Sequence, residues 1–143
     1  MPFEMFDVNG QVLIFEPILY DRDIYMTYKI QDQNFIQISY SCYFYEVELF
    51  EFIANLEKIQ QYSSQIFSMK SLVEEEFICN FSAPNSDLVI EINLMKYSLY
   101  QGAKDTTVQI VLVIPFEYKS AIIHKFNMLK NQIIALKTKP IIT

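Results

Sequence analysis

Glycine, histidine and cysteine are scarce in this chain, and their scarcity excludes several kinds of site. The 143 residues include two glycines, Gly10 and Gly102, far apart in the sequence. A nucleotide-binding turn of the Rossmann or P-loop type needs two or three glycines close together, so the sequence predicts neither. One histidine, His124, and two cysteines, Cys42 and Cys79, are too few for a zinc site of the usual Cys/His type. We therefore predict no metal and no cofactor, and an enzyme is the least supported class of protein.

Long apolar runs and an N-terminal leader pattern are also missing. No apolar stretch approaches the roughly 20 residues of a membrane-spanning helix. The first residues, Met1-Pro2-Phe3-Glu4, have neither the basic segment nor the apolar core of a signal peptide. Apolar residue types nevertheless make up 52% of the chain and charged types 20%, a balance typical of a folded globular protein. We expect one cytoplasmic domain over residues 1–143, without internal repeats or linkers.

Basic residues are outnumbered by acidic ones, and the acidic excess lies in the first half. The chain has 11 basic and 17 acidic residues, a net charge of −6. Residues 1–76 hold 13 acidic and 4 basic residues, net −9, whereas residues 77–143 hold 4 acidic and 7 basic residues, net +3. This balance argues against direct binding of nucleic acid or of an anionic membrane and favours a basic partner. The alternative is a solvated surface on which some carboxylates compensate helix N-termini.

Alternation of apolar and polar residues predicts an antiparallel sheet. The clearest case is a hairpin of residues 24–30 and 36–42 around a polar turn. The last predicted strand has apolar residues on both faces, so we expect it in the centre of the sheet. Pro17 and the turn-forming Asp21-Arg22-Asp23 are expected to end the first strand. The predicted strands cover about residues 11–19, 24–30, 36–42, 65–69, 73–82, 88–94 and 108–114.

Two segments instead repeat their apolar residues at helical spacing. Leu49, Phe52 and Leu56 mark an amphipathic helix over about residues 46–62, and Ile122, Phe126 and Leu129 mark a second one over about residues 117–137. The expected fold class is α+β: an antiparallel, meandering sheet of six or seven strands with the two amphipathic helices packed on one face.

The residue types that could carry chemistry have ordinary interpretations. Cys42 and Cys79 fall on the apolar side of their strands and are expected in the core, and His124 flanks the second helical stripe. Glu74 and Glu76 share a strand face at about 6–7 Å, but without tryptophan or long loops we expect no sugar-binding cleft around them. Tyrosines on the less apolar faces or at element ends are expected to anchor an interface: Tyr25, Tyr43, Tyr45 and Tyr97.

The order of these elements resembles the WapI-type family of bacterial immunity proteins, which protect cells from polymorphic contact-dependent toxins. The resemblance covers residues 22–136. It rests on the hairpin 24–42, on the helix start Tyr45-Glu46-Val47-Glu48-Leu49-Phe50-Glu51-Phe52, and on the hairpin segment 77–85 followed by Leu88. It implies a non-enzymatic protein that binds and neutralises a cognate toxin domain.

The acidity of the first half suggests that this toxin domain is basic. Our hypothesis for the toxin-facing surface is a set of seven carboxylates: Asp21, Asp23, Glu46, Glu48, Glu51, Glu74 and Glu76. Two other classes stay open. A homo-oligomeric structural or adaptor protein would use an exposed sheet edge or helix face, and a small-ligand binder or enzyme would need an enclosed polar pocket.

Overall fold

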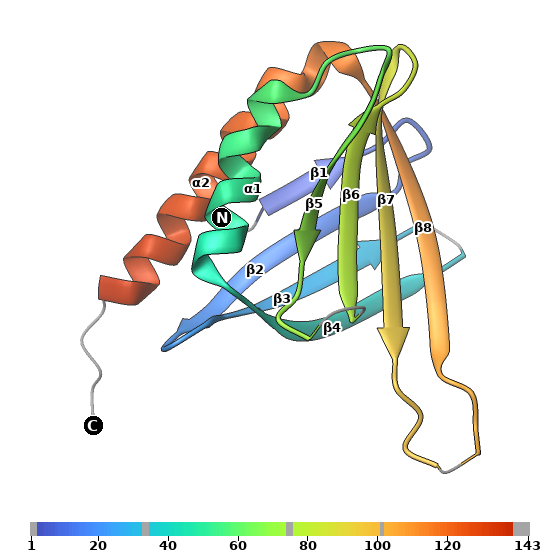
Figure 1. The fold of residues 1–143 in the computed structure, drawn as a ribbon, viewed down its shortest axis with the longest axis vertical. Coiled ribbons are helices and arrows are strands. Elements are labelled where there is room, and N and C mark those ends of the chain that lie inside the picture. The colour runs from blue at the N-terminus through green and yellow to red at the C-terminus, as the bar shows by residue number, and fades with distance from the viewer. Residues whose placement is uncertain (1–2, 33–34, 74–75, 101, 139–143) are drawn as a thin grey trace.

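The computed structural model describes residues 3–32, 35–73, 76–100 and 102–138, and its strands form two sheets (Figure 1). Within these residues each sheet has four antiparallel strands, in the orders β1-β2-β3-β4 and β5-β6-β7-β8. The elements are β1 (Phe3–Phe6), β2 (Val12–Tyr20), β3 (Ile24–Gln31), β4 (Gln37–Phe44), α1 (Glu46–Asn55), a 3₁₀ turn (Leu56–Lys58), β5 (Ser63–Lys70), β6 (Phe77–Ala83), β7 (Asp87–Lys96), β8 (Thr106–Pro115), a second 3₁₀ turn (Phe116–Tyr118) and α2 (Lys119–Thr138). The α+β class is confirmed, but the expected single sheet of six or seven strands is two sheets of four.

The two sheets face one another, and this explains why sequence patterning suggested a single sheet. Each strand has one apolar face, which is equally compatible with a covering helix and with a second sheet. In the structure the ring of Phe77 in β6 packs against three rings of the first sheet, Phe15 at 5.8 Å, Tyr28 at 4.7 Å and Phe44 at 5.7 Å between centroids. The apolar faces of the two sheets therefore contribute to one core, against which α2 also packs over β1 and β2.

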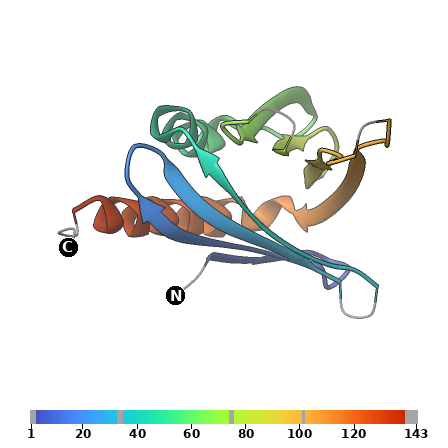
Figure 2. The same cartoon turned by 90° about the horizontal axis from the view of Figure 1, so that it is seen from below.

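Each helix packs against the sheet that it does not directly follow in sequence. α1 follows β4 but lies beside β5, whereas α2 follows β8 but lies across β1 and β2. Figure 2 shows the resulting two layers, with α1 beside the second sheet and α2 alongside the first. Phe126 of α2 joins the layers, since its ring contacts Phe3 at 4.5 Å and both Phe52 and Phe81 at 5.6 Å. The helices therefore do not share one face of one sheet, and the order of four strands and a helix occurs twice without a sequence repeat.

One predicted boundary near the centre of the chain was wrong, and one proline within a strand was accommodated, for local reasons. The first helix was expected to reach residue 62, but α1 ends at Asn55, and the chain turns into β5 at Tyr62, whose φ is +60°. The first predicted strand, residues 11–19, agrees with β2, which continues past Pro17 to Tyr20 because the strand pairing shifts between Pro17 and Leu19. A proline has no N–H to donate, and such an irregularity is where a strand tolerates it.

The prediction that the last strand is central was also wrong, because β8 is an edge strand. Its free edge is partly covered by the loop between β1 and β2. Val8 donates its N–H to the carbonyl of Val113 at 3.0 Å, and the Gln11 side-chain amide donates to the carbonyl of Val111 at 3.0 Å. The free edge of β8 thus lies beside a loop from the other sheet rather than beside a further strand, and Val111 on its second face is exposed.

Candidate functional site: the groove between α1 and β5

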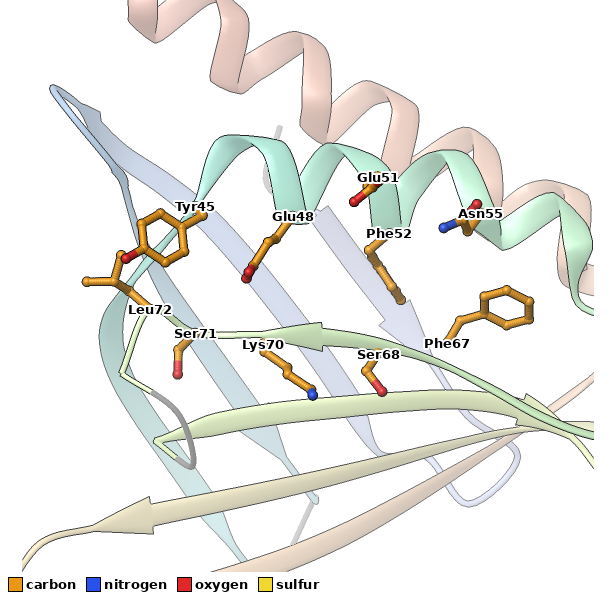
Figure 3. Close-up of a pocket in the computed structure, with 10 residues that line it drawn as sticks. All are labelled: Tyr45, Glu48, Glu51, Phe52, Asn55, Phe67, Ser68, Lys70, Ser71 and Leu72. Carbon is orange, nitrogen blue, oxygen red and sulfur yellow. The ribbon is translucent and has the colours of Figure 1, made fainter.

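A groove of about 350 Å³ separates α1 from the edge strand β5 (Figure 3). Two of the predicted partner-binding carboxylates, Glu48 and Glu51, lie on its helical wall and are exposed. The lining residues are Tyr45, Glu48, Glu51, Phe52 and Asn55 from α1 and the residue before it, and Phe67, Ser68, Lys70, Ser71 and Leu72 from β5 and its exit. The helical residues recur at intervals of three or four, which places them on one side of α1.

The opposite wall of the groove is held by hydrogen bonds within the second sheet. Ser68 Oγ donates to Asn80 Oδ1 at 2.6 Å, which fixes the hydroxyl on β6. Ser71 Oγ donates to the carbonyl of Val73 at 2.6 Å and accepts the N–H of Phe77 at 3.1 Å, so the chain is ordered where it leaves β5. Leu72 then donates its N–H to the carbonyl of Tyr43 at 2.7 Å. This last bond joins the exit of β5 to the edge of β4 and closes one end of the groove.

The groove combines an apolar end with charged residues of both signs. Phe52 of α1 is buried, and Phe67 of β5 is half-buried. Figure 3 shows Glu48 and Phe52 reaching from α1 toward β5, on which Lys70 is exposed. In the part of the chain that the structure describes, the one ion pair joins Lys137 and Glu46, so Glu48 and Glu51 have no ion-pair partner there. Their carboxylates are therefore accessible to an external cation.

Glu46, in contrast, is bound within the molecule. Its carboxylate accepts a hydrogen bond from the Tyr20 hydroxyl at 2.5 Å and lies 3.4 Å from Lys137 Nζ, which is also 5.2 Å from the Tyr20 ring centroid. The Tyr20 hydrogen bond and then the Lys137 charge lower the pKa of Glu46. The Glu46 carboxylate in turn raises the pKa values of Tyr20 and Lys137. Glu46 thus ties the start of α1 to the end of β2 and to the last turn of α2.

The remaining predicted carboxylates lie outside the groove. Asp21 and Asp23 form the turn between β2 and β3, directly after Tyr20, so the turn adjoins the Glu46 contact. Glu76 is half-buried before β6, where its charge adds to the effect of burial in raising the pKa values of Cys42 and Tyr28. Glu74 lies outside the described residues. Among the described carboxylates, Glu48 and Glu51 therefore lie in the groove, and Asp21 and Asp23 lie in the turn beside Glu46. Glu76 lies apart from both pairs.

The predicted tyrosine anchors are also distributed over several surfaces. Tyr45 lines the groove next to Glu48, whereas Tyr25 and Tyr43 pair on the outer face of the first sheet, with ring centroids 4.7 Å apart. Tyr97 follows β7 at another end of the molecule. The pairing of α1 with β5 had no signal in the sequence, so Lys70 and Phe67 were not identified as site residues.

The cysteines and the histidine have no catalytic arrangement. Burial raises the pKa of the Cys42 thiol to about 12 and also raises the pKa of the fully buried Cys79, so both thiols are protonated at neutral pH. Their predicted place in the core is confirmed. His124 is exposed on α2 and does not line the groove.

Three further findings concern possible metal sites, membrane-spanning helices and similarity to known proteins. Among residues 3–32, 35–73, 76–100 and 102–138, no group of three or more histidines, cysteines and carboxylates is placed to hold a metal ion. No helix in the described part of the chain is long and apolar enough to cross a membrane. No family model, curated protein or solved structure matches this chain. The geometry and charge of the groove are therefore the basis for a functional proposal.

Proposed function

We propose that this is a non-enzymatic, cytoplasmic immunity-type protein that binds and neutralises a basic toxin domain through the carboxylates of the α1–β5 groove. The observation that carries the proposal is the pair Glu48 and Glu51, exposed on one helical wall without an ion-pair partner among the described residues. Tyr45 beside them supplies an amphipathic ring of the type that anchors protein interfaces.

Electrostatics gives this arrangement a mechanism of inhibition. A toxin that acts on nucleic acid presents a basic surface to its substrate, and an acidic protein can occupy that surface and exclude the substrate. The first 76 residues carry a net charge of −9, so the field of this half attracts a basic domain before contact. Asp21 and Asp23 extend the negative surface beyond the groove, whereas Glu46 acts mainly by fixing the start of α1.

The groove favours binding over catalysis. Its lining contains carboxylates, hydroxyls, one amide and one lysine, and neither cysteine nor His124 is among them. The two thiols are buried and protonated, so they do not supply a nucleophile. An open, mixed-charge groove with a tyrosine at its rim instead resembles the polar rim of a protein interface.

The first experiment is to read the gene immediately upstream of this one, since immunity genes commonly follow their toxin genes. The proposal expects a long secreted protein that ends in a compact, basic domain, and an ordinary metabolic gene there would count against it. Association of that purified domain with this protein is then measured by stopped-flow fluorescence at low and high salt.

Charge reversal provides the matched test of the groove. Glu48→Lys with Glu51→Lys should slow association by about tenfold or more at low salt, because electrostatic steering and close charge pairs are both lost. The difference should shrink at about 1 M salt, where the screening length is only about 3 Å. The control pair, Glu16→Lys with Glu117→Lys, makes the same change of net charge at exposed sites outside the groove. Equal slowing by both pairs would contradict the assignment of the groove.

A further inference from the structure

A second surface, at the end where the β3–β4 and β7–β8 connections lie, exposes an unusual amount of apolar area. We call it the mouth surface and define it by five residues, which with their exposed fractions are Phe35 (88%), Tyr40 (49%), Tyr97 (47%), Leu99 (89%) and Tyr100 (80%). Figure 1 shows the β7–β8 loop projecting beyond both sheets, on the opposite side of the molecule from α1. Exposed apolar clusters of this kind mark interaction sites more often than chance.

The projecting loop is held in shape by its own hydrogen bonds. Asp105 Oδ1 accepts the N–H of Ser98 at 2.6 Å, and Ala103 donates its N–H to the carbonyl of Tyr100 at 3.2 Å. Gly102 has a φ of +83°, a left-handed conformation that glycine adopts without strain. The bond between Ser98 and Asp105 joins the two ends of the connection, and Leu99 and Tyr100 beyond it are exposed to solvent.

An apolar hollow lies beside this loop, between β4 and the ends of β7 and β8. It has a volume of about 180 Å³, and Ile38, Tyr40 and Val108 line it together with Leu94 and Met95. Ile38 follows Phe35 after three residues, and Leu94 precedes Tyr97 by three, so the hollow adjoins both connections. The mouth surface therefore carries a projection and a recess next to one another.

We propose that a second copy of this chain docks on the mouth surface, with Leu99 and Tyr100 of each copy entering the apolar hollow of the other around a twofold axis. A twofold interface requires one surface to hold both complementary parts, because each contact occurs twice. The combination of an apolar projection and an apolar recess meets this requirement. A bilayer would use the projecting loop but has no need of the recess.

The available area is consistent with a weak, reversible dimer. An aromatic side chain contributes about 150–250 Å², so the exposed fractions of the four rings amount to about 500 Å² in each copy. The two copies together would bury at least about 1,000 Å², near the lower limit for a specific interface. We therefore expect a dissociation constant in the micromolar range. The α1–β5 groove would stay open in both copies, since it lies on the other side of the molecule (Figure 1).

The test is the mass of the purified full chain in solution, measured by sedimentation velocity and light scattering from about 1 to about 300 µM. The wild-type protein should shift from monomer to dimer over this range. Leu99→Ser with Tyr100→Ser should raise the dissociation constant by about 30-fold or more, the effect of losing an interface hot spot. The control, Val47→Ser with Tyr118→Ser, removes comparable exposed apolar residues away from the mouth surface and should leave dimerisation unchanged.

A second variant tests the loop without removing its apolar side chains. Asp105→Ala deletes the acceptor for Ser98 and should weaken the dimer by a smaller factor. A monomer at all concentrations, or a dimer unaffected by the Leu99/Tyr100 change, would overturn the proposal. Monomers that float with vesicles of anionic and neutral phospholipid would also overturn it and assign the loop to a bilayer. Failure here leaves toxin binding by the groove unaffected, because that assay uses different residues.

Discussion

Asp7 organises the contact by which the first sheet covers the edge of the second, and its replacement should lower stability measurably. Its Oδ1 accepts the N–H groups of Asn9 at 2.9 Å and Gln11 at 2.8 Å. Its Oδ2 accepts the Gln11 side-chain amide at 3.0 Å and the N–H of Val113 at 3.2 Å. One carboxylate thus orders the β1–β2 loop and satisfies a backbone donor on the edge of β8.

The expected magnitude follows from which of these donors water can replace. Asn9 is exposed, so its N–H can bond to solvent, whereas the bonds to Gln11 and Val113 are part-buried. Leaving the part-buried backbone donors of Gln11 and Val113 unsatisfied at about 1–1.5 kcal/mol each predicts a loss of about 2–3 kcal/mol for Asp7→Ala. Since each kcal/mol shifts Tm by roughly 3 °C in a chain of this length, Tm should fall by about 6–9 °C.

Urea unfolding and differential scanning calorimetry at neutral pH measure this loss. Asp105→Ala is the control, because that carboxylate accepts one exposed N–H, from Ser98, and should cost less than about 1 kcal/mol. Hydrogen exchange should also show faster exchange of the Val113 amide in Asp7→Ala. Equal Tm values for the two variants, or an unchanged Val113 amide, would refute the idea that this loop secures the edge of β8.

Two further predictions concern the core and the tie at the start of α1. Phe77→Ala should cost about 3–5 kcal/mol in urea unfolding, because Phe77 is fully buried against rings of the other sheet; a loss below about 1 kcal/mol would contradict that packing. Tyr20→Phe removes the hydrogen bond that lowers the pKa of Glu46 and should cost about 1 kcal/mol or less at pH 7, since the site is largely exposed. A lowered carboxyl pKa stabilises the fold above the unfolded value of about 4.3 and loses this effect as pH falls through the folded value. The difference between wild type and Tyr20→Phe should therefore shrink toward pH 3, and a difference that grows on acidification would refute the assignment.

Local patterns predicted most elements, but not their partners in space. The hairpin of β3 and β4 and the helical stripe of Phe52 and Leu56 were predictable, because alternation and helical spacing depend on residues close in sequence. β1 was missed because four residues are too short for alternation to be recognised. Neither the stacking of two sheets nor the place of β8 at an edge leaves a distinct pattern, since a strand with one apolar face fits several neighbours.

The candidate site shows the same division between local and tertiary information. Glu48 and Glu51 were identified from their charge and helical position, and they do share one wall of the groove. The pairing of Glu46 with Lys137 joins residues 91 positions apart, which no spacing rule reports. Charge alone therefore did not separate a carboxylate used for packing from two that remain accessible.

Each helix packs on the sheet that it does not follow in sequence, and for α1 this determines which residues line the groove. Glu48 and Glu51 lie on the side of α1 that lines the groove. Because α1 lies beside β5, they face a strand that ends in Lys70, and Glu46 at the start of the helix is fixed by Tyr20 and Lys137. Fixing a helix at its start reduces the entropy lost when its side chains bind a partner. Under the proposed function, Glu46 would therefore support partner binding by Glu48 and Glu51 through the position of the helix.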